Sequence, residues 1–158
     1  KRHGALSSNI KRCGLTVAEL SRRDPAKLQE SYPGHFDVAI VDAPCSGQSL
    51  GVKGVEAAGA FHPVTIKKNA LRQRRIIANS LGLVRPGGYL LYSTCTFSLE
   101  ENEAIISWLL ERFPNIETVT VPILEEFRTT YAPFAAYRIY PHSLVGAGAF
   151  TCLLRRSS

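Results

Sequence analysis

Two cysteines, Cys45 and Cys95, each lie in a short polar turn directly after an apolar run. The turns read Asp-Ala-Pro-Cys-Ser-Gly (42–47) and Ser-Thr-Cys-Thr (93–96). A thiolate is a strong nucleophile that forms covalent intermediates, and a second proton-carrying group nearby can complete such a reaction. A single free cysteine is more often inert core packing. Two cysteines in polar turns, together with Asp42, form a candidate catalytic site.

The elements on either side of these turns predict where they lie. The runs 36–41 and 89–93 have the continuous apolar composition of buried strands, and residues 64–84 between them have helical spacing of apolar residues. A right-handed crossover makes the two strands parallel neighbours. Ligands of open α/β sheets bind beyond the carboxyl ends of the strands. Cys45 and Cys95 are therefore expected to face the same crevice.

The remaining elements predict α/β alternation around a mainly parallel sheet in a single domain, 1–158. Pro-Gly-Gly (86–88) is expected to end the long helix and turn the chain. The other expected elements are a strand at 9–17, a short helix from Asp24-Pro25, a long loop at 46–63, a helix to residue 113 opened by a Ser98–Glu101 capping box, and strands at 117–123 and 149–154.

Composition limits the classes of function. The net charge of +6 favours a polyanionic partner such as RNA, but it also fits an ordinary solvated surface. No apolar run is long enough to span a membrane and no signal peptide is recognisable, so we expect no membrane partner and a cytoplasmic location. The four cysteines form no Cys-x-x-Cys pair, which argues against a metal site.

Two groups of side chains could contact RNA. A basic helix face at 67–75 could bind phosphates, and aromatic residues near the C-terminus could stack on bases. A solvated face and core packing are the alternatives for the two groups. The residues are Lys67, Lys68, Arg72, Arg74 and Arg75, and Tyr131, Phe134, Tyr137 and Tyr140.

An ordered set of motifs resembles the RNA cytosine-5 methyltransferases of the Sun/NSUN group. The resemblance covers about residues 36–113 and the C-terminal tail, and it includes His142, to which no chemical role is assigned. It implies a Rossmann-like sheet that binds S-adenosylmethionine, and rRNA or tRNA as substrate. The motifs are the two cysteine turns, Pro-Gly-Gly (86–88), Glu-Glu-Asn-Glu (100–103), Arg-x-x-Pro-His (138–142) and Gly-Ala-Phe (148–150).

The same resemblance implies roles for four residues. Cys95 would add to carbon 6 of cytosine, which makes carbon 5 nucleophilic enough to take a methyl group. Cys45 would assist release by helping to remove the proton at carbon 5. Asp42 would hydrogen-bond the cytosine edge and, with Pro44, lie close to the cofactor.

Some expected cofactor residues have no match. The glycine-rich loop of the first strand, the acidic residue that follows and a nearby lysine are not found. We therefore expect a sheet that lacks its first strands, with apolar surface exposed beside 36–41, the N-terminal part of the protein as a partner, and weak cofactor binding by this chain alone. A non-catalytic RNA-binding or scaffold protein, and a small-molecule or protein methyltransferase, are the competing interpretations. The cysteine pair argues against both.

Overall fold

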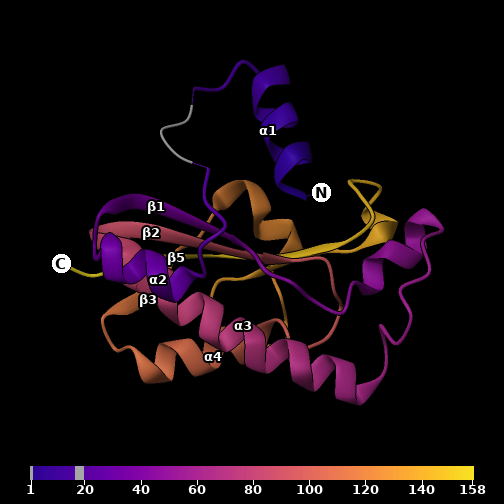
Figure 1. Ribbon diagram of the computed structural model, residues 1–158. Helices are drawn as coiled ribbons and strands as arrows, with labels where there is room; N and C mark the ends of the chain where they lie inside the picture. Colours follow the sequence, from indigo (N-terminus) through magenta and orange to yellow (C-terminus); the bar gives the residue numbers. More distant parts are fainter. Residues whose placement is uncertain (1, 17–19) are drawn as a thin grey trace.

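A mixed sheet forms the centre of the molecule, and helices pack on one of its faces (Figure 1). The computed structural model describes residues 2–16 and 20–158. The strand order is β1-β2-β5-β3, and β4 pairs with β5. The strands are β1 Phe36–Asp42, β2 Val84–Thr94, β3 Ile116–Thr118, β4 Tyr137–Ile139 and β5 Ala149–Arg156.

The strand pairing confirms the α/β class but corrects the expected sheet. β1 and β2 are parallel neighbours, as predicted. β5, however, is antiparallel to β2, β3 and β4. The prediction of a mainly parallel sheet is therefore wrong for the pairings, because β5 is inserted between β2 and β3, which point the same way.

Helices α2, α3 and α4 lie together on one side of the sheet (Figure 1). The predicted helices at 24–28 and 64–84 are confirmed, and Asp24 caps α2 by accepting from the Ala26 N–H. The 3-10 helix η1 occupies part of the expected loop 46–63. The expected strand 117–123 is shorter than predicted: strand β3 ends at Thr118, and η2 begins at Pro122. The helices are α1 Arg2–Arg12, α2 Pro25–Ser31, α3 Pro63–Leu83 and α4 Glu103–Arg112, with 3-10 turns η1 Gln48–Lys53, η2 Pro122–Phe127 and η3 Pro141–Ser143.

The predicted strand at 9–17 is wrong, and its last residue, Val17, lies outside the described residues. Helix α1 runs to Arg12 instead. Gly14 ends it at φ 65°, and the N–H groups of Gly14 and Leu15 donate to the carbonyls of Lys11 and Ile10. This is the Schellman pattern, in which a left-handed glycine satisfies the last carbonyls of a helix.

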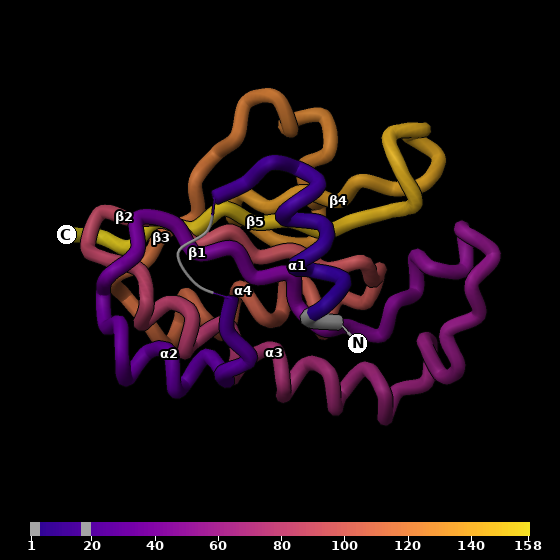
Figure 2. The backbone as a smooth tube through the Cα atoms, turned by 45° about the horizontal axis from the view of Figure 1, so that its top comes forward, coloured from indigo at the N-terminus to yellow at the C-terminus, as the bar shows by residue number. Residues whose placement is uncertain are grey.

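The core lies between the sheet and the pair α3 and α4. The tube view shows both helices running beneath the strands (Figure 2). Apolar side chains every three or four residues along each helix are buried, so the helical spacing in the sequence matches the packed face. The largest fully buried apolar side chains are Ile77, Leu90, Tyr92, Ile105, Ile106, Leu109, Tyr137, Phe150 and Leu154.

The opposite face of the sheet is open at β1. Val38 is 52% exposed and Ile40 is 71% exposed, whereas Val41 on the other face is buried. The prediction that β1 is buried on both faces is therefore wrong, and the expected exposure of apolar surface beside it is confirmed. β1 is also an edge strand, because it stands at one end of the strand order and pairs with β2 on one side.

Pro-Gly-Gly (86–88) forms an irregularity inside β2. Helix α3 ends before it, at Leu83, and β2 continues through the motif with a register shift opposite Phe36 and Val38. A Cβ atom on Gly88 would lie 2.7 Å from the Asp37 carbonyl oxygen and 2.8 Å from Cγ1 of Val84. The strand therefore needs glycine at 88 so that β1 can approach it.

We expect Gly88→Ala to lower the free energy of unfolding by about 1–3 kcal/mol, the usual range for overpacking a tight site. Thermal unfolding of the full-length protein measures it. Gly51→Ala is the matched control, because a Cβ there meets nothing within 4 Å. Equal melting temperatures for the two variants would contradict this explanation of the motif.

Candidate active site

The two cysteine turns leave the sheet side by side. β1 and β2 pair in parallel up to Asp42 and Ser93, and the Ala43 N–H donates to the Ser93 carbonyl at 2.9 Å. Because parallel strands end at the same edge of a sheet, the chain segments that follow both strands start from adjacent points. The sheet therefore brings the sequences after Asp42 and Ser93 together.

The thiols of Cys45 and Cys95 are in contact. Their Sγ atoms are 3.2 Å apart and both side chains are half-buried. A disulfide bond is about 2.05 Å long, so these are two free thiols joined by a hydrogen bond. The expectation that Cys45 and Cys95 face the same place is confirmed.

The surroundings of Cys45 keep its thiol protonated. Burial, and after it the hydrogen bond with the Cys95 side chain, raise the pKa of Cys45 to about 12. Only a thiolate attacks an electrophile. Cys45 is thus suited to holding and giving a proton at neutral pH rather than to attacking a substrate.

Asp42 and Pro44 border this pair. Asp42 is the last residue of β1 and is exposed, and its carboxylate makes no hydrogen bond to another described residue. The Pro44 carbonyl accepts a hydrogen bond of 2.9 Å from the Gln73 side chain of α3. The carboxylate of Asp42 is therefore available to a ligand, whereas the backbone at Pro44 is fixed.

Glu101 holds the Cys45 turn through a hydrogen bond to its backbone. Its side chain is fully buried, and one carboxylate oxygen accepts from the Ser46 N–H at 3.0 Å and from Gln73 Nε2 at 2.8 Å. The Tyr92 hydroxyl donates to the Glu101 carbonyl at 2.8 Å. The predicted Ser98–Glu101 capping box is wrong, because Glu101 points into the core and Ser98 donates to Glu100 instead.

Asn102 holds the Cys95 turn in the same way. Its Oδ1 accepts from the Thr94 hydroxyl at 2.6 Å, and its Nδ2 donates to the Thr96 carbonyl at 2.9 Å. These two partners are the residues on either side of Cys95. One buried amide thus fixes the backbone before and after the thiol.

Glu103 ties the C-terminal segment to the same helix start. It forms a buried ion pair with Arg138 of β4, and Oε1 also accepts from the Thr129 hydroxyl at 2.6 Å. Burial opposes the charge of Arg138, but the hydrogen bonds to Glu103 raise the pKa of Arg138 above its usual value. The Arg138 guanidinium is therefore held in its charged form.

Direct hydrogen bonds also join the two turns. The hydroxyls of Ser46 and Thr96 are 2.8 Å apart. Gln48 of η1 accepts from the Phe97 N–H at 2.9 Å, and the Ser49 N–H donates to the Cys95 carbonyl at 3.1 Å. The site is consequently a connected set of hydrogen bonds, in which neither turn can move alone.

Gln73 was missed by the sequence analysis, although a signal was present. It lies three residues after Ala70 and four before Ile77, within the apolar stripe of α3, and it is fully buried. A polar residue inside an apolar stripe must find a buried partner. Gln73 finds two of them in Pro44 and Glu101.

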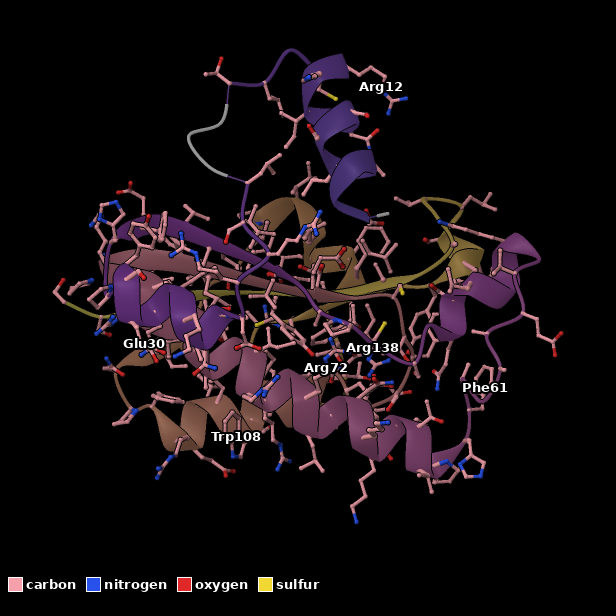
Figure 3. The ribbon with its side chains drawn as sticks, in the orientation of Figure 1. Arg12, Glu30, Phe61, Arg72, Trp108 and Arg138 are labelled. Carbon is pink, nitrogen blue, oxygen red and sulfur yellow. The ribbon has the colours of Figure 1, made fainter. Side chains whose placement is uncertain are left out.

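Some of the residues proposed to contact RNA are accessible in the structure, and others are paired or packed in the core. On α3, Arg74 lies over the ring of Trp108, and Arg75 pairs with Asp24, while Lys67, Lys68 and Arg72 are exposed (Figure 3). Phe134 and Tyr137 belong to the core, whereas Tyr131 and Tyr140 line a surface pocket together with His142.

The described part of the chain shows neither a metal-binding cluster nor a membrane-spanning helix. It holds no cluster of three or more His, Cys, Asp or Glu side chains arranged for a metal ion. None of its helices combines the length and the apolar character that a membrane crossing requires.

Comparisons with known proteins show the family to which the chain belongs. The sequence pattern of the family described as 16S rRNA methyltransferase RsmB/F matches residues 1–155. The chain belongs to this RsmB/F family. The chain is 32% identical to ribosomal RNA small subunit methyltransferase F of Klebsiella pneumoniae over 97% of its own length and 32% of that protein. It thus spans about a third of the curated relative.

Two solved structures share the fold of this RsmB/F family member. The crystal structure of PH0851 superimposes with a TM-score of 0.89 at 28% identity, covering 98% of this chain and 34% of that one. The crystal structure of NSun6 from Pyrococcus horikoshii with SFG gives a TM-score of 0.73 at 25% identity, covering 97% of this chain and 38% of that one.

The rate of alkylation of Cys45 tests whether its thiol is protonated. We expect iodoacetamide to alkylate Cys45 more slowly than the exposed Cys13 at about pH 8, because its pKa is raised to about 12. The Cys45 rate should still be rising above about pH 9, as thiolate forms. Mass spectrometry of peptides from the reduced protein measures both rates together. Equal rates at about pH 8 would argue against a protonated Cys45.

Replacing Asn102 tests whether its two hydrogen bonds hold the Cys95 turn. We expect Asn102→Ala to lower the free energy of unfolding by about 2 kcal/mol or more, because the Thr94 hydroxyl and the Thr96 carbonyl lose their hydrogen bonds to the Asn102 amide. Chemical denaturation measures the loss. Asn69→Ala on α3 is the control, and should stay within about 0.5 kcal/mol of wild type. A loss no larger than in the control would show that Asn102 does not hold the Cys95 turn.

Proposed function

We propose that this chain carries the covalent centre of an S-adenosylmethionine-dependent RNA cytosine-5 methyltransferase, with Cys95 as nucleophile. The observation that carries the proposal is the contact of 3.2 Å between two free thiols at neighbouring strand ends. One thiol that attacks the base and a second that is protonated at rest and exchanges a proton at release match the two stages of this reaction. A scaffold that only binds RNA has no need of either thiol.

Cys95 acts first. Its thiolate adds to carbon 6 of cytosine, and the electron pair moves to carbon 5, which becomes an enamine-like nucleophile. The Cys45 thiol, 3.2 Å away, is placed to hydrogen-bond to the Cys95 sulfur and to stabilise its anionic form. Asn102 and the Ser49 N–H keep the turn fixed while the bond forms.

Cys45 acts at release. After methyl transfer, carbon 5 must lose its proton before the bond to Cys95 can break and leave Cys95 as thiolate. Cys45 first loses its own proton to water. Its thiolate, a strong base because the pKa is raised to about 12, then takes the proton from carbon 5, and the electron pair left behind expels Cys95 as thiolate. Cys45 therefore serves the elimination step, and Glu101 keeps its turn in place through Ser46.

Asp42 serves the base and the cofactor. Its exposed carboxylate at the end of β1 can hydrogen-bond the polar edge of cytosine and stabilise charge on the ring. When bound, S-adenosylmethionine supplies the methyl group that carbon 5 attacks. Asp42 and Pro44 fit beside it, since one carboxylate is free and the adjoining backbone is rigid. The crystal of the related NSun6 with SFG, an S-adenosylmethionine analogue, supports this cofactor.

The proposed substrate is 16S rRNA. The family description names 16S rRNA and the relatives are named for the small ribosomal subunit. The net charge of +6 and the exposed Lys67, Lys68 and Arg72 suit a polyanion.

We expect Cys95→Ala in the full-length protein to abolish methylation of a 16S rRNA transcript and to form no adduct. Cys45→Ala should also lose turnover but should accumulate a covalent RNA–protein adduct, because elimination is blocked after attack. Denaturing gels detect the adduct, and transfer of a radioactive methyl group measures activity.

Cys13→Ala is the matched control, since Cys13 is exposed and far along the chain from both turns. It should behave as wild type. An adduct in Cys95→Ala but not in Cys45→Ala would reverse the two roles, and full activity in Cys95→Ala would refute the proposal.

A further inference from the structure

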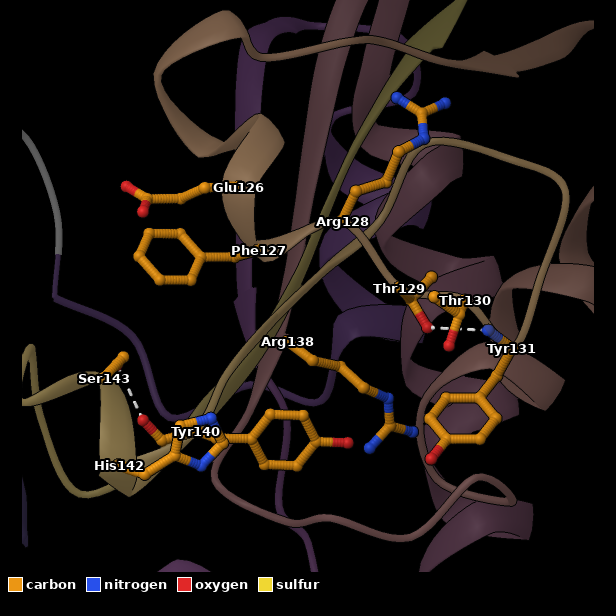
Figure 4. A pocket seen from close by; sticks show the side chains of 10 residues that line it. All are labelled: Glu126, Phe127, Arg128, Thr129, Thr130, Tyr131, Arg138, Tyr140, His142 and Ser143. Carbon is orange, nitrogen blue, oxygen red and sulfur yellow. Dashed lines mark hydrogen bonds between the residues drawn. The ribbon is translucent and has the colours of Figure 1, made fainter.

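A surface pocket of about 290 Å³ lies beside β4, between the segment that follows η2 and the turn η3 (Figure 4). Its walls are aromatic and its polar groups are mostly uncharged. Tyr131 stands on one side and the Tyr140 and His142 rings on the other, with the Arg138 guanidinium between them (Figure 4). The Arg138 guanidinium lies over one face of the Tyr131 ring, 5.1 Å from its centroid. Because Tyr131 is still 60% exposed, a planar ligand has access to the rest of the ring.

An aromatic stack connects this pocket to the Cys95 turn. The Phe97 ring stacks on Tyr140, with centroids 6.0 Å apart and planes at 27°. Tyr140 stacks on His142, at 5.5 Å and 13°. Phe97 lies two residues after Cys95, so the pocket begins where the proposed catalytic turn ends.

The backbone around this stack is built to hold it. The Phe97 carbonyl accepts from Arg138 Nη1 at 3.0 Å, and its N–H donates to Gln48. A Cβ atom on Gly148 would lie 2.6 Å from the Phe97 ring. Glycine at 148 therefore admits the ring that carries the stack.

The charges around the pocket are already neutralised. Arg138 is paired with Glu103, and Arg128 with Glu125 at 2.9 Å. Glu126 adds a carboxylate to the lining. A phosphate group would meet no uncompensated cation here and would be repelled by Glu126. Ring faces and the hydroxyls of Thr129, Thr130 and Ser143 instead suit a neutral, planar, hydrogen-bonding ligand.

We infer that this pocket binds an unpaired nucleobase of the RNA substrate, close in sequence to the cytosine that Cys95 attacks. The inference rests on the proposed function for the identity of the RNA. Tyr131 and His142 supply the stacking surfaces, and the hydroxyls of the lining meet the base edge. The Phe97–Tyr140 stack fixes the distance between this base and the target.

The test uses the full-length protein and a 16S rRNA transcript that contains 4-thiouridine. After ultraviolet irradiation and digestion, cross-linked peptides are expected to contain Tyr131, Tyr140 or His142. Filter binding should give a dissociation constant about tenfold higher for His142→Ala, the size of effect expected when a base loses one aromatic partner. His142→Phe should stay within about twofold of wild type, and so should Val145→Ala, an exposed neighbour outside the pocket.

Salt dependence separates a base from a phosphate. The slope of log affinity against log salt should be the same in His142→Ala and wild type, because stacking releases no counterions. A smaller slope would mean that the pocket holds a phosphate and would overturn the inference, as would unchanged affinity of His142→Ala.

Failure of the inference and failure of the proposed function give different results. A Cys95 adduct that accumulates in Cys45→Ala, with unchanged affinity of His142→Ala, refutes the pocket alone. Cross-links in the pocket without any Cys95 adduct would refute the methyltransferase proposal and leave the base-binding pocket standing.

Discussion

Three consecutive residues at the start of α4, Glu101, Asn102 and Glu103, bury a carboxylate, an amide and a second carboxylate in one short stretch. Such burial is unfavourable unless every group finds partners. Each of the three finds partners in a different segment: the Cys45 turn, the Cys95 turn and β4. Of the two Glu101 carboxylate oxygens, Oε2 makes these bonds and Oε1 has no hydrogen-bond partner among the described residues. The penalty for leaving any of them unpaired therefore fixes three distant segments relative to one helix end.

This arrangement explains how the thiols come to have different character. The parallel pairing of β1 and β2 sets the two turns side by side, and the buried polar residues beneath them hold the sulfurs in contact. Contact and burial together favour the neutral thiol of Cys45, since a second negative charge beside an ionised Cys95 would be repelled. The different roles proposed for these two chemically identical side chains thus follow from their positions.

The sequence predicted the elements that local patterns encode. The apolar runs of β1 and β2 and the spacing along α3 located the strand ends, and hence Cys45 and Cys95. Ser98 and Glu101 have capping-box spacing, but the partners of Glu101 are Ser46 and Gln73, 55 and 28 residues away. Such long-range pairing leaves no local signal. β4, with three residues, is held by its pairing to β5 and has no recognisable pattern of its own.

The two faces of the sheet contribute to different parts of the proposed reaction. Side chains alternate along a strand, so Asp42 lies on the same face as Ile40 and Val38, which are exposed, while Val41 packs on the helices. The buried side chains that hold the two cysteine turns come from the helix-covered side: Gln73 from α3, and Glu101 and Asn102 from the start of α4. Whatever packs over Val38 and Ile40 also sets the surroundings of the Asp42 carboxylate. The covalent step is thus preorganised by the core, and base and cofactor positioning are governed from the open face.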